Sequence, residues 1–414
     1  MDKSDKKSLL YPAMHKLYSA LLNLEKFEKG NNLFDNISYL DSFFSEYRNI
    51  TFVLQKSLKK SIFEHIYIAN RDKYLAGEIN KWFIDKRNEV LKEHPFQLEK
   101  KIKITLYTPR TSISLLERVF SIDNDTSIDI TMEALKSVLN YINALEIFFS
   151  VDFSFYEKGS DKELLEDLII GVHTMIAFMN AMKHDIDEDC SLCNKLQEKI
   201  NKFNFFRLPK EALFIDDYVY YRQEKRFEKS SKGMMFFSEN PTLKQRSSTE
   251  RLTCNYKMNE FDFFIIMHCI ALSKQESLMP TFYIIYEDNT FEILSYLSSI
   301  KTVTYRKINE IAKRIKSDKI KQVYYATEMI QYKIENYTKI KNSTSPNRTN
   351  YKERDILACY KLDKNGNNEV YYFDSDQVGD MKYVSSILKN PSNNHSDDLK
   401  DSFLCPIIDS FDEK

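Results

Sequence analysis

Residues 36–60, NISYLDSFFSEYRNITFVLQKSLKK, carry a regular pattern of apolar residues. The apolar positions recur with the period of an α-helix for about five turns, which is typical of a helix that packs one face against a core. They are Leu40, Phe44, Tyr47, Leu54 and Leu58, with Phe43 and Val53 widening the stripe. The chain has 414 residues but only 7 Gly and 9 Pro. Because both residue types interrupt helices, their scarcity predicts long helices and few tight turns.

Residues 1–205 are predicted to form a helical bundle with extra helices. A second helix is expected from about Lys73 to Glu93, and the alternating apolar residues of KIKITLYTP then suggest a short strand. Further helices are expected at about 111–120, 130–150, 161–184 and 191–204. This order of elements favours one helical N-terminal domain.

The rest of the chain is predicted to be a smaller α+β sheet domain. An irregular linker region is expected at 206–255, where SENPTLKQRSSTE lacks periodicity. Residues 256–389 are rich in β-branched and aromatic residues and form the α+β domain, and residues 390–414 are expected to be a flexible acidic tail. Strands are expected in FDFFIIMHCIAL, PTFYIIYEDNTFEILSYL, KQVYYATEM, RDILACYKL and EVYYF, with a helix near 303–316. The predicted fold class is therefore α+β and mostly helical.

The charge of the chain is balanced overall but uneven along it. The net charge is -1, whereas residues 1–110 carry 20 Lys+Arg against 14 Asp+Glu. A mildly basic N-terminal part is compatible with RNA binding, although solvated helix faces have the same composition. The polar start MDKSDKKSLL lacks the apolar segment of a signal peptide, and we expect no membrane helix. These features predict a cytoplasmic protein whose six cysteines are reduced.

The segment KRNEVLKEHPF contains the residue types that metal-independent RNA cleavage requires. His94 is suited to moving protons at neutral pH, and Arg87 is suited to holding a phosphate through bidentate contacts. If the helix continued through His94, the two side chains would lie about 20° apart on one face and roughly 10 Å apart along the axis. That distance is too long for both to reach one phosphate within one chain. Activity would then require a dimer that places two such helices together.

A structural interpretation of the same segment remains open. Pro95 disfavours helix at His94, so His94 is expected near the helix end, where the macrodipole favours a His without any catalytic role. Arg87 would then be one member of a surface set with Lys86 and Glu89.

The two helical segments SYLDSFFSEYRNITFVLQKSL and WFIDKRNEVLKEHPF together resemble the HEPN superfamily of helical-bundle proteins. The resemblance covers about residues 30–110. Many members of that superfamily are RNases of toxin–antitoxin, CRISPR-associated and abortive-infection systems, and others lack the catalytic pair and serve as binding modules. The family motif is an Arg, often followed by a polar residue, with a His near the helix end. Arg87, Asn88 and His94 match it at the long limit of its spacing, and Lys92 occupies the place of the His at a more usual spacing.

The resemblance implies roles for these residues. His94 is the expected acid or base, Arg87 the expected phosphate clamp, and Asn88 a positioning group. Arg48 and Lys92 are expected to contact RNA, although Arg48 could instead form a salt bridge to Glu46 or to a carboxylate on a neighbouring helix.

Several other patterns are weaker. Cys190-Ser-Leu-Cys193 is a CxxC without the further ligands of a zinc site, so we expect no metal and no cofactor. His173 and His268 lie among apolar residues and are expected to be core residues. The chain also lacks a Gly-rich phosphate-binding motif.

The C-terminal part resembles a widespread uncharacterised bacterial α+β domain. The resemblance rests on Glu328 at a strand corner and Arg354 before the next strand. It leaves open whether the two residues pair across the loop or line a ligand pocket.

The function expected from these features is a metal-independent HEPN-type endoribonuclease of a bacterial anti-phage defence or toxin system, acting as a homodimer. An antitoxin or a defence-system protein would be its partner. The alternative is a catalytically inactive HEPN-like protein that binds a partner or RNA as one component of such a system. A metal-dependent enzyme using His184 and the cysteine pair is a third alternative.

Overall fold

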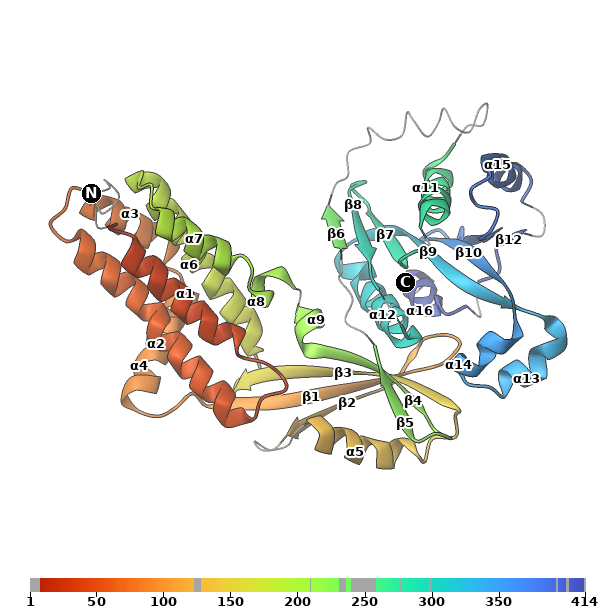
Figure 1. The fold of residues 1–414 in the computed structure, drawn as a ribbon, viewed down its shortest axis with the longest axis horizontal. Helices are drawn as coiled ribbons and strands as arrows, with labels where there is room; N and C mark the ends of the chain where they lie inside the picture. Colours follow the sequence, from red (N-terminus) through yellow and green to blue (C-terminus); the bar gives the residue numbers. More distant parts are fainter. Residues whose placement is uncertain are drawn as a thin grey trace. The chain divides into compact units, whose positions relative to one another are not determined.

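The computed structural model describes residues 8–122, 128–208, 210–230, 236–239, 258–275, 277–297, 299–391, 394–399 and 402–412. The fold is α+β (Figure 1). It divides into two compact units. Unit 1 comprises Met1–Lys103, Arg118–Leu135 and Val151–Asp216, and unit 2 comprises Ile104–Glu117, Lys136–Ser150 and Asp217–Lys414.

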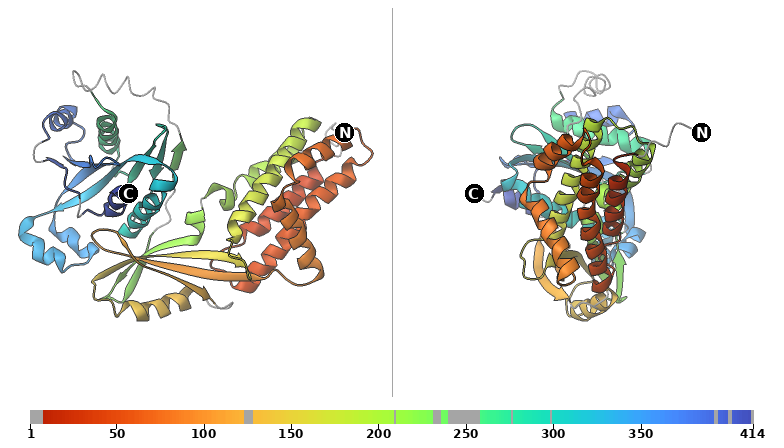
Figure 2. Two further views of the ribbon diagram at one scale, coloured as in Figure 1. Left: turned by 180° about the vertical axis from the view of Figure 1, so that it is seen from behind. Right: turned by 90° about the vertical axis from the view of Figure 1, so that its left-hand side faces the viewer.

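Long helices dominate unit 1 and lie side by side in the views of Figure 2. The expected long helix is confirmed as α2, Leu33–Leu58, whose N-terminus is capped by the Asn32 side chain. The second expected helix is α4, Glu78–Lys92, which begins after Gly77 and is therefore shorter than predicted. The other helices of this unit are α1 (Tyr11–Glu25), α3 (Glu64–Tyr74), α6 (Leu164–Ile186), α7 (Ser191–Ile200), α8 (Asn204–Arg207) and α9 (Lys210–Phe214).

Helix α1 is held at both ends by residues far along the chain. The Glu188 carboxylate accepts hydrogen bonds from the backbone N–H groups of Leu9 at 2.8 Å and Leu10 at 3.0 Å. At the other end, the Glu25 carboxylate accepts from the N–H groups of Asn204 at 2.9 Å and Phe205 at 3.2 Å. Hydrogen bonds thus attach both ends of α1 to the segments around α7 and α8.

Helix α6 packs against α3 and α4. Among the described residues it is the one helix long and apolar enough to span a membrane, with a mean hydropathy of 1.4 in its most apolar window. The expectation that no segment approaches this composition is wrong for α6. Its buried face includes Leu168, Val172, Phe178 and Met182, which pack within the protein.

A five-stranded sheet has the order β2-β1-β3-β4-β5. Its strands are β1 (Leu98–Tyr107), β2 (Ser114–Ile122), β3 (Glu146–Glu157), β4 (Ile215–Tyr221) and β5 (Arg226–Lys229), and helix α5 covers Ile128–Leu139. The strand in KIKITLYTP is confirmed. The helix expected at 111–120 is wrong, because this segment is strand β2, and the helix expected at 130–150 gives way to strand β3.

Unit 2 contains a seven-stranded sheet of order β12-β11-β10-β9-β7-β8-β6. The pairs β10–β11, β9–β10, β7–β9 and β7–β8 are antiparallel. The strands are β6 (Phe236–Glu239), β7 (Thr281–Tyr286), β8 (Phe291–Ser295), β9 (Ile320–Tyr332), β10 (Lys352–Asp363), β11 (Glu369–Asp374) and β12 (His395–Ser396). Both expected hairpins are therefore confirmed. The predicted SENPTLKQRSSTE loop, beyond its first two residues, lies outside the described residues.

Helices pack on both faces of this sheet, because alternate strand residues point to opposite sides. One core joins Val323 and Ala358 to α12 (Lys301–Ser317) and α16 (Cys405–Asp412). The other joins Tyr324 and Cys359 to α11 (Glu260–Lys274) and α15 (Met381–Lys389). The short helices α13 (Tyr337–Lys341) and α14 (Ser345–Arg348) follow β9.

Two segments of unit 2 differ from the sequence expectations. FDFFIIMHCIAL forms helix α11 and not a strand, and it begins at a capping box formed by Asn259 and Asp262. The tail expected to be flexible contains α16, whose Ile407 is fully buried in the core beside α12. His268 is buried as expected, on α11, whereas His173 is exposed on α6.

The burial of His268 predicts a loss of stability in mild acid. Its ring Nδ1 lies 2.8 Å from the carbonyl oxygen of Phe264, and burial lowers its pKa from 6.5 to about 4, while that hydrogen bond opposes the change. The unfolded chain protonates His268 first, so this stability is complete above pH 6.5 and is lost as the pH falls from 6.5 towards 4. We expect urea unfolding to show a loss of up to about 3 kcal/mol. The His268→Gln variant should lose much less, and an identical pH profile in both proteins would contradict this assignment.

Candidate functional site

Arg87 lies on the half-buried side of α4 and faces helix α2. Its guanidinium carbon is 5.7 Å from the centre of the Phe52 ring, and its Nη1 donates a hydrogen bond of 3.1 Å to the Asn88 side-chain oxygen. The Nε atom of Arg87 is buried and has no hydrogen-bond partner among the described residues. Asn88 thus orients Arg87 but leaves donor capacity on the guanidinium unused.

His94 lies beyond the end of α4. The helix ends at Lys92, Glu93 adopts a non-helical conformation, and the His94 N–H donates to the Glu89 carbonyl oxygen at 3.2 Å. The imidazole is 44% exposed, with Nε2 3.5 Å from a carboxylate oxygen of Glu89. The position near the helix end that Pro95 predicted for His94 is therefore confirmed, and the helical alignment of His94 with Arg87 does not form.

Asp41 on α2 is the second carboxylate beside His94. It accepts a 3.0 Å hydrogen bond from the N–H of Phe96. Burial raises the pKa of Asp41, whereas that hydrogen bond and the nearby His94 lower it. His94 accordingly lies near two acidic side chains, Asp41 and Glu89.

Arg87 and His94 lie beside different levels of α2. Arg87 contacts Phe52, whereas His94 lies near Asp41, and these two residues are eleven positions apart on that helix. Eleven helical residues span about 16 Å. One chain therefore does not place the two side chains on one phosphate.

Arg48 joins Arg87 at the Phe52 ring. Its guanidinium carbon is 4.1 Å from the ring centre, and its Nη1 donates to the Thr51 hydroxyl. Burial lowers the pKa of Arg48, the nearby Tyr67 raises it, and the positive charge of Arg87 lowers it further. No described carboxylate lies within ion-pair distance of either guanidinium, and Glu46, the alternative partner of Arg48, instead pairs with Lys16 at 3.0 Å. We call this group the Arg48–Phe52–Arg87 site.

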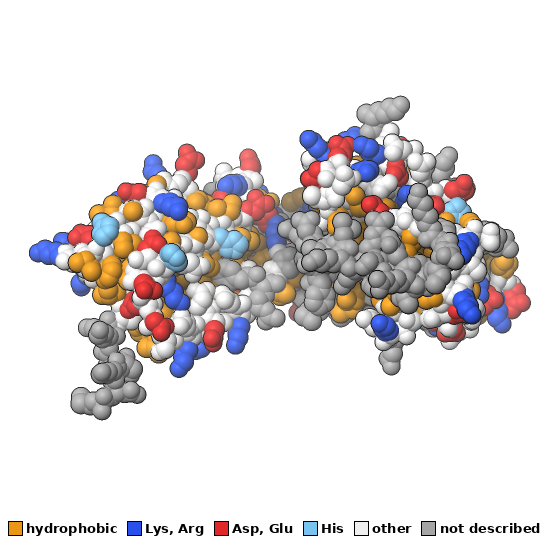
Figure 3. Space-filling view, turned by 90° about the horizontal axis from the view of Figure 1, so that it is seen from above, with side chains coloured by type: hydrophobic (Ala, Val, Ile, Leu, Met, Phe, Trp, Pro, Cys, Tyr) orange, Lys and Arg blue, Asp and Glu red, His pale blue; other side chains and the backbone are white. Residues whose placement is uncertain are grey.

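The two arginines differ from the neighbouring Lys86 of α4 in having no carboxylate partner among the described residues. Lys86 pairs with Glu89 at 2.7 Å and also with Glu157. Lys92 is exposed at the last residue of α4. On the face shown in Figure 3, basic and acidic side chains are interspersed over the helical part.

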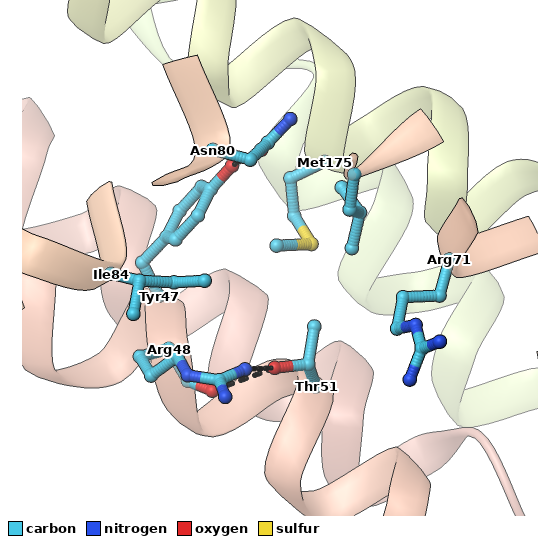
Figure 4. Close-up of a pocket in the computed structure, with 8 residues that line it drawn as sticks. Tyr47, Arg48, Thr51, Arg71, Asn80, Ile84 and Met175 are labelled. Carbon is cyan, nitrogen blue, oxygen red and sulfur yellow. Dashed lines mark hydrogen bonds between the residues drawn. The ribbon is translucent and has the colours of Figure 1, made fainter. Parts of the chain in front are cut away.

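Sequence reasoning missed Phe52 and Arg71. Phe52 lies outside the apolar stripe of α2 and is 42% exposed. The sequence did contain a signal for it, because Phe52 is an aromatic residue one helical turn after Arg48 and does not belong to the stripe. Arg71 on α3 lines a cavity of about 140 Å³ together with Arg48 (Figure 4). No sequence spacing indicates this proximity, because it depends on how α3 packs against α2.

The cysteine pair begins helix α7. The Cys190 sulfur accepts a 3.1 Å hydrogen bond from the N–H of Cys193, so it caps the helix. Both thiols are buried, and burial raises the pKa of Cys193 to about 12. Within the described ranges, no three His, Cys, Asp or Glu side chains lie together in a way that would hold a metal ion.

Glu328 and Arg354 do not pair with each other. The Glu328 carboxylate accepts a 2.7 Å hydrogen bond from the N–H of Leu278, whereas Arg354 binds the side chains of Gln331 at 2.9 Å and Asp374 at 3.1 Å. Each residue thus fastens a different part of the seven-stranded sheet.

Comparison of the chain with protein-family models, with curated proteins and with solved structures finds no match.

Proposed function

We propose that the helical part of unit 1 is a HEPN-like bundle that binds single-stranded RNA at the Arg48–Phe52–Arg87 site. The observation that carries the proposal is the pair of arginines on one exposed aromatic ring without a carboxylate partner. Two neighbouring guanidinium groups repel each other, and a phosphate between them removes that repulsion. Aromatic rings with adjacent arginines also provide stacking surfaces for unpaired bases.

Titration of fluorescently labelled single-stranded RNA tests this proposal. We expect Arg48→Gln and Arg87→Gln each to weaken binding about tenfold, because each removes charge-assisted hydrogen bonds to phosphate. Each should also reduce the slope of log affinity against log salt concentration by about one. Phe52→Ala should weaken binding by a similar factor with little change in the salt dependence.

The matched control is Arg118→Gln, which removes an exposed arginine on β2 outside the site. It should bind RNA as the wild type does. Equal affinity of the wild type, Arg48→Gln and Arg87→Gln would overturn the proposal.

A second candidate is a metal-independent endoribonuclease that acts in the cytoplasm as a homodimer, within a bacterial defence or toxin system and controlled by an antitoxin or other partner protein. The observation that favours it is the exposure of His94 beside Asp41 and Glu89, away from Arg87 of the same chain. A second copy would supply His94 as proton donor or acceptor to the phosphate held by Arg87, with Asn88 orienting the arginine. Lys92, exposed at the end of α4, would add a contact to the RNA backbone.

Mixing two inactive variants tests this shared site. Wild-type protein should cleave RNA in the presence of EDTA, whereas His94→Ala and Arg87→Ala should each be inactive and should not arrest growth. A one-to-one mixture should recover about a quarter of the wild-type activity, since half of the dimers then contain one intact site of two. A mixture that stays inactive would contradict a site built from two copies, and cleavage abolished by EDTA would contradict the metal-free reaction.

A further inference from the structure

The cavity beside the Arg48–Phe52–Arg87 site is enclosed by four helices of unit 1. It has a volume of about 140 Å³ and receives side chains from α2, α3, α4 and α6. The lining residues are Tyr47, Arg48, Thr51, Arg71, Leu75, Asn80, Ile84 and Met175. We call it the Arg48–Arg71 pocket. In the view of Figure 4, Thr51 lies between the guanidinium groups of Arg48 and Arg71.

The electrostatics of the pocket are positive. The pKa of Tyr67 is raised by burial and lowered by both Arg71 and Arg48, so both cations act on the same small region. The Nε and Nη2 atoms of Arg71 both donate hydrogen bonds to one oxygen of Asp72, at 2.8 Å and 2.6 Å. Arg48 has no carboxylate partner among the described residues. Arg87 adds a third positive charge next to Arg48. Of these three arginines, Arg71 alone has a carboxylate partner among the described residues.

The remaining walls limit what the pocket can hold. Leu75, Ile84 and Met175 are apolar, whereas Asn80 and Tyr47 bind each other at 3.1 Å and are already engaged. A volume of this size holds several water molecules but is below the roughly 300 Å³ of a site for a drug-sized ligand. A phosphate group fits these limits, and a whole nucleoside does not.

We propose that the Arg48–Arg71 pocket binds a phosphomonoester group, with Arg48 and Arg71 on its oxygens. A monoester carries up to two negative charges, whereas each internal phosphodiester of RNA carries one. The positive pocket therefore selects a terminal phosphate over an internal one. Because Arg48 belongs to both sites, an RNA strand on the Arg48–Phe52–Arg87 site would end in this pocket, and this part of the inference rests on the proposed function. A free phosphate or nucleotide is the other source of the same group.

Thermal unfolding of the full-length protein with inorganic phosphate tests the pocket without RNA. We expect millimolar phosphate to raise the unfolding temperature of the wild type by about 3 °C. Arg71→Gln should abolish this rise, and Arg118→Gln should keep it. Asp72→Asn should increase it, since it releases Arg71 from its ion pair with Asp72 while leaving the pocket walls unchanged.

Binding of RNA with and without a terminal phosphate tests the source of the group. We expect phosphate-ended RNA to bind the wild type about tenfold more tightly than hydroxyl-ended RNA. Arg71→Gln should reduce this ratio to about one, whereas Arg87→Gln should weaken both RNAs and keep the ratio.

The outcomes separate the two proposals. RNA binding without a terminal preference and without a phosphate effect on unfolding would overturn the pocket and leave the proposed function standing. A phosphate effect that depends on Arg71, without any RNA binding, would support the pocket with a free phosphomonoester as its ligand and overturn the proposed function. Since Arg71 is 45% exposed, Arg71→Gln should fold, and Arg71→Lys should retain part of the phosphate effect through its charge alone.

Discussion

We expect the Asp217→Asn variant to lose about 3 to 5 kcal/mol of its free energy of unfolding, because it removes the bidentate counter-charge of the buried Arg306 guanidinium. Asp217 and Arg306 are both nearly inaccessible, and their side chains form a bidentate pair, with Nε to Oδ1 at 3.0 Å and Nη2 to Oδ2 at 2.9 Å. Arg306 also donates to Glu310 at 2.7 Å, but Glu310 is shared with Lys307. Urea unfolding of the variant measures the loss.

Two further variants make this result specific. Glu117→Gln breaks the exposed pair with Lys313 and should change the free energy of unfolding by less than about 1 kcal/mol. The double replacement of Asp217 by Leu and Arg306 by Met removes both charges and should recover much of the stability lost in Asp217→Asn. An Asp217→Asn protein as stable as the wild type would show that the stability contributed by the Asp217–Arg306 pair does not depend on the charge of Asp217.

The second large effect is expected at Gly171, in the middle of α6. A Cβ atom at this position would lie 2.2 Å from Cε2 and 2.3 Å from Cζ of Phe83. The Phe83 ring cannot retreat, because Phe44 at 5.5 Å and Tyr47 at 4.4 Å pack against it. Gly171→Ala should therefore destabilise the protein by about 3 kcal/mol, despite the better helix propensity of Ala.

A compensating change tests whether Phe83 is the cause. Phe83→Leu should restore part of the stability in the Gly171→Ala background while destabilising the wild type, so the two changes should be strongly non-additive. The control is Gly77→Ala, at the start of α4, where an added Cβ meets no atom within 4 Å. Additive losses in the double variant would contradict the proposed clash.

A helix with one buried face could be predicted from sequence alone. Helix α2 shows a clear helical period because one stripe is buried and the opposite side is solvated. Helix α11 was mistaken for a strand because it is buried over most of its circumference, so no period remains. Strand β2 was mistaken for a helix because nearly all its residues are exposed and its apolar residues do not alternate. Helix α16 was missed because its few apolar residues follow an acidic stretch. Their role in the core becomes visible only in the structure, where they pack against α12.

The candidate site was predictable in part. Arg48, Arg87 and Asn88 were singled out from sequence, and the structure places both arginines on one ring. The position of His94 near the end of the helix was also predicted correctly, from Pro95, since α4 ends at Lys92. Arg71 could not be predicted, because its proximity to Arg48 arises from the packing of one helix against another.

The hydrogen bonds at the two ends of α1 have a consequence for synthesis of the chain on the ribosome. The partners of its N-terminal and C-terminal ends, Glu188 and Asn204, lie 178 to 180 residues later in sequence than the groups they bind. At typical elongation rates, α1 emerges roughly 10 to 40 seconds before these partners exist. During that interval its apolar face, with Leu17 and Leu21, has α2 as cover but lacks α7. The native packing of α1 is therefore completed only after residues 188–205 have been translated.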